Sequence, residues 1–288
     1  MTGFLQHLLI TFRLNFRYIQ AFIMGYFVPL FFLIAFKGLY GSKPPLMSEF
    51  GQLLTVSTLG GACFGLPVSL VTERERGVWR RYRLAPMATG WFVASLMLAR
   101  FAMIFSSALL LLGVAMAFGM PLPTHPVELL AAYTISAFAF LSLGLVIAML
   151  ASSSGAVQGM GQCIFLPMII LGGVGVKIET LPAWGKQVAA FLPSHYAVRV
   201  MTECIIKTAY RADGSIKSGA ALSSTVSQFD LGALAVIGLS CCLISVKLFR
   251  WESDQKTTLA SKLWALAALA VWGVVGLTAQ YYKFNIGK

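Results

Sequence analysis

The chain has 288 residues, of which 58% are hydrophobic and 11% are charged, and its formal net charge is +12. A soluble globular domain carries about 25% charged residues, so this composition excludes a water-soluble particle and indicates a polytopic membrane protein. The positive charge could serve a nucleic-acid partner. However, lysine and arginine also gather in the cytoplasmic loops of membrane proteins, and we expect no nucleic-acid binding.

Residues 2–17 precede the first long apolar run. Their apolar side chains recur three to four positions apart, at Phe4, Leu5, Leu8, Leu9 and Phe12, and Arg13 and Arg17 follow. This pattern predicts an amphipathic helix that lies in the membrane interface. A helical extension of the first span fits the same pattern, and the sequence leaves both open.

Apolar runs long enough to cross a bilayer recur along the whole chain. A spanning helix needs about 20 residues, and the candidate spans are Tyr18–Phe36, Leu53–Val71, Ala88–Phe118, Val127–Ala151, Gln158–Val176, Leu231–Phe249 and Leu263–Tyr282. The third run is long. We therefore expect it to begin inside the cytoplasm and to extend the Arg100 side chain to the membrane boundary.

The densest charge cluster lies between the second and third runs, in the stretch LVTERERGVWRRYRLAPM. Thr72 and Glu75 have the spacing of a capping box at a helix start, with acidic residues near that start and arginines toward the far end. Pro86 would stop the helix. The pattern predicts a short cytoplasmic helix from Thr72 to Leu84 that offers charged and apolar contacts to a soluble partner. The plain alternative is a solvated basic loop.

The segment Lys177–Lys207 is apolar but broken. Pro182 and Pro193 divide it into two pieces of about ten residues. Two short helices in a re-entrant hairpin fit it better than one span. If it does not cross, the basic clusters near both ends of the chain lie inside, as the positive-inside rule favours. The predicted topology then has seven spans, with the N-terminus on the cytoplasmic side and the C-terminus on the outer side of the membrane.

Motifs of common chemistries are missing from the sequence. There is no GxxxxGK[ST] loop, no HExxH and no GxSxG, and the nearest phosphate-loop match is GGVGVK at 172–177. The five cysteines and three histidines match no metal spacing. Glu128 and Asp230 fall at predicted span ends, so they do not indicate a proton relay inside the membrane. We therefore expect no catalytic residue and no metal ligand.

Two stretches resemble landmarks of a known family. ERERGVWRRYRLAPM is similar to the E-[RK]-[ED]-x-G-T-x-x-x-L-x-x-[TS]-P signature of permease subunits of ABC-2 type transporters. The stretch from Leu166 to Met201 resembles the family's glycine-terminated fifth span with its outer re-entrant hairpin. The resemblance covers roughly residues 1–250. Val78 stands where the family usually has Thr, and Ala85 where Thr or Ser often precedes the proline.

The resemblance implies an all-α polytopic membrane protein with a six-span ABC-2 permease core. Residues 1–250 would hold the N-terminal amphipathic helix, the core, a coupling helix at 72–86 and the outer hairpin at 177–207. Residues 251–288 would add a cytoplasmic linker and an extra seventh C-terminal span. It also implies a second permease copy, giving a homodimer in the bacterial plasma (inner) membrane. Two copies of an ABC ATPase subunit would bind ATP and Mg, so this chain itself needs no cofactor.

The resemblance also implies roles for the residues at matching positions of this chain. The ATPase-coupling residues would be Glu73, Arg74, Glu75, Arg76, Gly77, Trp79, Arg80 and Arg81. The substrate path between two copies, along spans two and five, would be lined by Cys63, Phe64, Gln162, Phe165 and Met168. The outer gate would be Pro182, Trp184, Phe191, Pro193 and Tyr196. Gly61, Gly65, Gly155 and Gly159 could bring the two copies close together.

We expect an ATP-driven exporter that moves a hydrophobic small molecule, such as a drug or antibiotic, or a lipid outward. Export of a polysaccharide by the same kind of permease is one alternative. A membrane assembly or signalling scaffold without transport is another. A secondary carrier has less support, because intramembrane ionisable residues and internal repeats are not evident.

Overall fold

A computed structural model of the chain describes residue 12 and residues 22–41, 46–79, 89–206, 209–210, 216–217, 225–249 and 259–286. The expected amphipathic helix over 2–17 and the linker that follows Phe249 lie outside these residues, apart from Phe12. Arg80 and Arg81 also lie outside them.

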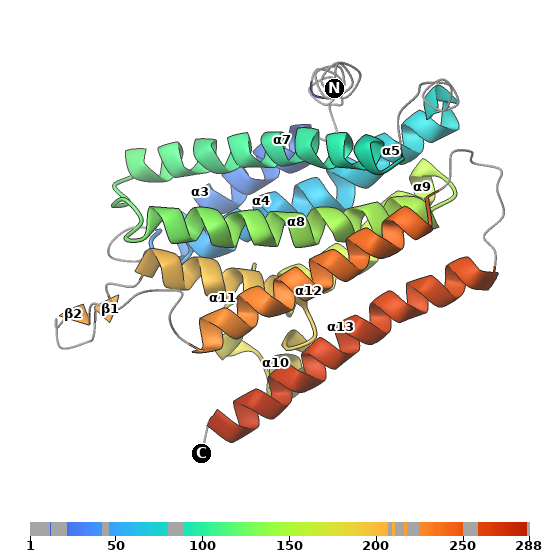
Figure 1. Ribbon diagram of the computed structural model, residues 1–288. Coiled ribbons are helices and arrows are strands. Elements are labelled where there is room, and N and C mark those ends of the chain that lie inside the picture. The colour runs from blue at the N-terminus through green and yellow to red at the C-terminus, as the bar shows by residue number, and fades with distance from the viewer. Residues whose placement is uncertain are drawn as a thin grey trace.

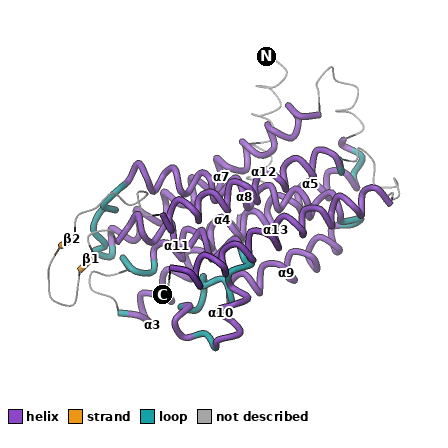
Figure 2. Tube along the Cα trace, turned by 60° about the horizontal axis from the view of Figure 1, so that its bottom comes forward, coloured by secondary structure: helices purple, strands orange, loops and turns teal. Residues whose placement is uncertain are grey.

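Helices make up nearly all of the described chain (Figures 1 and 2). In chain order they are η1 (Ile23–Phe27), α3 (Val28–Tyr40), α4 (Phe50–Gly60), η2 (Gly61–Gly65), α5 (Leu66–Glu75), α7 (Thr89–Ala117), α8 (Pro126–Leu150), α9 (Ser154–Ile170), η3 (Ile178–Thr180), α10 (Ala183–Ala189), α11 (Pro193–Ile206), α12 (Thr225–Lys247) and α13 (Leu259–Ile286). Two short antiparallel strands, β1 (Ala209–Tyr210) and β2 (Ile216–Lys217), lie at one end of the molecule.

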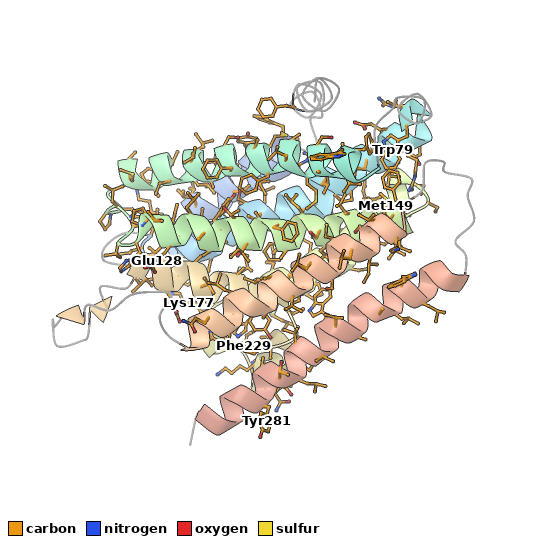
Figure 3. The ribbon with its side chains drawn as sticks, in the orientation of Figure 1. Trp79, Glu128, Met149, Lys177, Phe229 and Tyr281 are labelled. Atoms are coloured by element: carbon orange, nitrogen blue, oxygen red, sulfur yellow. The ribbon has the colours of Figure 1, made fainter. Side chains whose placement is uncertain are left out.

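The long helices run side by side, so the bundle has two ends (Figure 3). Trp79 and Met149 mark one end, and Glu128 and Lys177 mark the other. We call these the Trp79 end and the Lys177 end.

The fold is that of an all-α polytopic membrane protein. Within the described residues, Phe50–Glu75, Gly90–Ala117, Pro126–Leu150 and Gln228–Lys247 are helical stretches long and apolar enough to cross a membrane. Gly25–Tyr40 and Ser154–Ile170 are shorter apolar helices. Within the described residues the predicted apolar runs fall largely on helices, because backbone groups without water must pair with each other. The exception is the end of the run Gln158–Val176, since α9 ends at Ile170.

The central element is the continuous helical stretch 50–75, formed by α4, η2 and α5, which we call span two. Nearly all of it is buried by its neighbours. Its polar side chains bond within the bundle: the Thr55 hydroxyl donates to the Gly51 carbonyl at 2.8 Å, and the Ser57 hydroxyl donates to the Ser107 hydroxyl at 3.1 Å. Span two is therefore the core of this chain rather than one of its outer faces.

Arg100 on α7 is buried against span two. Its guanidinium donates to the Gly65 carbonyl at 2.7 Å and to the Ser69 hydroxyl at 2.8 Å. The expectation that this side chain extends to the membrane boundary was wrong. The π-helical turn η2 and the start of α5 offer oxygen acceptors inside the bundle, and a buried arginine requires such acceptors.

The predicted pair of short helices within Lys177–Lys207 is confirmed. Pro182 caps α10, and Pro193 opens α11. Proline is tolerated at these positions because its missing N–H would have no helical partner there. The break between the helices follows from the sequence, and it folds the segment back on itself.

Helix α8 crosses η2 at very close range. A Cβ atom added to Gly144 would collide with the backbone carbonyl of Ala62. The Gly144→Ala variant should therefore lose about 1–3 kcal/mol of unfolding free energy, because neither backbone can move freely. Reversible unfolding in mixed detergent and SDS would measure the loss.

Gly113→Ala on α7 is the matched control, because nothing lies within 4 Å of the added atom. Alanine favours a helix over glycine by up to about 1 kcal/mol, so this variant should lose no stability. Equal losses in the two variants would contradict the close crossing.

Candidate functional site

The charged stretch 73–79 lies at the Trp79 end, and its helix begins elsewhere than predicted. Helix α5 passes through Thr72 and ends at Glu75, with the Arg76 N–H donating to the Thr72 carbonyl at 3.0 Å. Gly77 then has a φ of +69°, and Val78 and Trp79 are helical again. The prediction that a helix begins at Thr72 was wrong, because the preceding helix α5 continues through Thr72 and ends only at Glu75. A left-handed glycine is the actual stop.

Arg74 joins the end of α5 to the end of α8. Its side chain is only 3% exposed. One guanidinium nitrogen donates to the Ala148 carbonyl at 3.2 Å, and the other donates to the Ala151 carbonyl. The last carbonyls of a helix have no partner inside it, and they attract positive charge. Arg74 therefore caps α8.

The next residue, Glu75, holds the start of α9. Its carboxylate accepts from the Ser154 N–H at 3.0 Å, and the Ser153 hydroxyl accepts from the Ala156 N–H at 3.2 Å. Negative charge and serine oxygens stabilise a helix N-terminus. Two consecutive residues of α5 thus fix both sides of the α8–α9 turn, a contact the sequence analysis missed. The run of serines at 152–154 was the available N-cap signal.

Trp79, labelled in Figure 3, is fully buried, and its ring belongs to an aromatic cluster with Phe92 and Phe249. Its ring stacks on Phe249 with centroids 5.2 Å apart and meets the edge of Phe92 at 5.6 Å. Phe92 belongs to α7, and Phe249 follows α12. The segment after α5 is therefore anchored to two further spans.

The structure brings Glu73, Arg74, Glu75, Arg76, Gly77 and Trp79 together at this end. Arg74 and Trp79 are buried, so they offer no exposed surface to a soluble partner, and their role in coupling stays a prediction. Their hydrogen bonds and ring contacts run to other segments of the same chain. Glu75 and Arg76 are exposed, and they form the described part of the surface open to a partner.

The predicted path residues separate into two groups. Cys63, Phe64 and Met168 are buried in the core, and the Phe64 ring packs edge-on against Phe165 at 5.1 Å. Cys63 and Phe64 are buried because span two is central, and Met168 is buried on the inner side of α9. Gln162 is exposed and Phe165 is half-buried, both on α9.

Gly61 also faces inward. A Cβ atom there would collide with the Ile104 side chain of α7, so Gly61 serves packing within the chain. Gly159 is different, because it is exposed and nothing lies within 4 Å of its added atom. Of these two glycines, only the one on α9 is open to a second copy.

The predicted gate residues share the α10–α11 hairpin but differ in exposure. Pro182 and Trp184 are exposed, Phe191 is half-buried, and Pro193 and Tyr196 are buried. The Tyr196 hydroxyl donates to the Ala190 carbonyl and so closes the turn between the two helices.

Helix α13 packs on this hairpin, which the sequence did not predict (Figure 1). The Trp272 indole N–H donates to the Phe191 carbonyl, and the Gln280 amide donates to the Gln187 carbonyl at 3.2 Å. The extra helix therefore covers the hairpin by satisfying its backbone. Polar residues inside an aliphatic run were the signal for such a contact.

Comparison with known families gives one result. A family model described as ABC-2 type transporter matches residues 4–206. That range includes both stretches singled out in the sequence. No curated protein and no solved structure matches the chain.

The buried aromatic cluster predicts a large stability effect. Trp79→Ala should lower the free energy of unfolding by about 3–5 kcal/mol, because it opens a cavity between Phe92 and Phe249. Trp91→Ala on α7 is the matched control, since that ring is 62% exposed, and its effect should be within about 0.5 kcal/mol. SDS unfolding followed by the remaining tryptophans would compare them. Similar losses would contradict the anchoring role.

Proposed function

The chain belongs to the ABC-2 type transporter family, and we propose that two copies of it form the membrane path of an exporter driven by a separate ATPase chain. A multi-pass permease subunit of an ABC transporter is not itself the ATPase. Energy must then enter through contact with that partner. The proposal places the Trp79 end on the cytoplasmic side of the bacterial inner membrane, where two ATPase subunits hydrolyse ATP with Mg.

The observation that carries this proposal is the double contact of α5 with the α8–α9 turn. A partner that pushes on the exposed Glu75 and Arg76 moves residues bonded directly to other spans. Arg74 passes the movement to α8, and Glu75 passes it to α9. Trp79 passes it to α7 and to the end of α12. Such a packed, hydrogen-bonded junction transmits displacement, whereas a solvated loop would absorb it.

The outer face of α9 supports the position of the path. Gln158 and Gln162 are exposed on this helix, and an amide in hydrocarbon without a hydrogen bond costs roughly 2–7 kcal/mol. They are better placed against water or a second copy than against lipid. Gly155 and Gly159 on the same helix allow a second backbone to approach closely. In this proposal α9 therefore lies at the contact between the two copies and beside the path.

The cargo class follows from the same face. The exposed apolar side chains of Leu166 and Ile170 continue the line of Gln158 and Gln162 at four-residue spacing, so the amides and the apolar groups share one face of α9. This mixture suits a hydrophobic small molecule or a lipid with a polar group. The α10–α11 hairpin lies at the Lys177 end, away from the coupling contacts, and we assign it as the outer gate of an export path.

Charge reversal tests the partner contact. Reversing Arg76 together with Arg80 and Arg81, each to Glu, should remove the ABC ATPase subunit from the affinity-purified complex and abolish ATP-driven transport. Arg76 is exposed, so the fold should survive. Mass spectrometry of the purified complex and transport of a lipophilic dye in proteoliposomes are the readouts. Lys37→Glu at the opposite end is the matched control and should change neither. A triple variant that retains both partner and transport would refute the coupling site.

Disulfide cross-linking tests the second copy. Cys163 is free and exposed on α9, whereas Cys63, Cys204 and Cys241 are buried. If two copies meet along this helix, mild oxidation in native membranes should give a band of twice the chain's mass. Cys163→Ser should remove that band. Persistence of the band in the variant would place the dimer contact elsewhere.

A further inference from the structure

A pocket of about 440 Å³ lies at the Lys177 end and takes no part in the coupling site or the α9 face. It opens between the start of α4, the helix α11 and the loop that carries Gly173 and Lys177. Its polar lining consists of Ser48, Gln52, Lys177, Arg199, Thr202 and Glu203. Small-molecule sites in proteins commonly have volumes of about 300–1,000 Å³, so the pocket can hold a small polar ligand.

Both cations of the pocket already have carboxylate partners. The Lys177 ammonium lies 3.0 Å from a Glu49 carboxylate oxygen, and Arg199 lies 3.3 Å from an oxygen of Asp230. Both carboxylates are buried. An anionic ligand would have to compete with these internal partners, so the two cations do not make an anion site.

Glu203 adds a third carboxylate. It lies on α11 one helical turn after Arg199 and interacts unfavourably with Asp230. Among the described residues no ion pair involves Glu203. Among the described residues two cations therefore face three carboxylates, and one negative charge remains in excess. That excess favours a cation.

Three atoms of the lining residues lack a hydrogen-bond partner. They are the Gln52 carbonyl oxygen, the Thr202 hydroxyl and one Glu203 carboxylate oxygen. Gln52 is only 5% exposed, and its amide N–H donates to the Gly173 carbonyl at 2.8 Å, which leaves the oxygen unpaired. Buried polar atoms are almost always paired. All three atoms can accept a hydrogen bond, so a ligand that donates hydrogen bonds would satisfy them.

We propose that this pocket binds a protonated primary amine. An ammonium group carries one positive charge and three N–H donors, which matches the excess charge and the three acceptors. A quaternary ammonium has the charge but no N–H donor. A free small amine and the ethanolamine head of a membrane lipid share the required chemistry. The site needs neither an ATPase partner nor transport, so it stands independently of the proposed function.

The test uses the purified full-length chain in detergent, titrated with ethylammonium and, separately, with tetramethylammonium. Ethylammonium should raise the unfolding temperature in a saturable way, and tetramethylammonium should not. Glu203→Gln keeps the side-chain shape and should weaken ethylammonium binding about tenfold or more, because a charge-assisted hydrogen bond is lost. Glu128→Gln, at the same end but outside the pocket, should leave binding unchanged.

A second variant guards against a folding defect. Thr202→Val removes one acceptor at nearly constant volume and should weaken ethylammonium binding severalfold. Equal responses to the two cations would overturn the proposal, and so would unchanged binding in both pocket variants.

Lipid nanodiscs distinguish the two sources of the amine. Discs of phosphatidylethanolamine should stabilise the chain over discs of phosphatidylcholine if the lipid headgroup is the ligand, and Glu203→Gln should abolish that difference. Saturable ethylammonium binding without any lipid difference would assign the site to a free amine. Absence of both effects would overturn the proposal.

Discussion

Arg74 donates to two carbonyls at the end of α8, and the architecture of the Trp79 end depends on this interaction. A guanidinium in an apolar bundle is costly unless its donors are satisfied, and helix-terminal carbonyls are costly unless their acceptors are. Each group removes the cost of the other. The end of α5 is therefore fixed against α8, and Gly77 can turn the chain there so that Trp79 reaches Phe92 and Phe249.

Arg100 uses the same kind of chemistry on the other side of span two. It bonds to the Gly65 carbonyl and the Ser69 hydroxyl, so α7 is attached to the middle of span two as Arg74 attaches α8 to its end. Backbone carbonyls accept from both arginines, and the Ser69 hydroxyl also accepts from Arg100. Span two is thus held by two charged side chains as well as by apolar packing.

The sequence predicted what depends on local pattern. The apolar runs predicted where the helices lie, and Pro182 and Pro193 predicted where the helices α10 and α11 begin. The prediction of a helix start at Thr72 failed because a capping box starts a helix only where the previous helix has already ended. The prediction that Cys63 and Phe64 line a path failed because nearly every side of span two is buried by its neighbours, so no single apolar face in its sequence shows which side faces outward. The Arg74 and Glu75 contacts join residues more than 70 positions apart, and no local signal predicts such pairs.

Helix α13 lies outside the stretch shared with the family, yet it bonds to the hairpin through Trp272 and Gln280. The position of the hairpin and the position of the last helix are therefore thermodynamically linked. If the hairpin moves, it either breaks these two hydrogen bonds or carries the whole of α13 with it. Viscous drag on a long helix slows such a movement. The C-terminal helix can thus set how fast the hairpin moves.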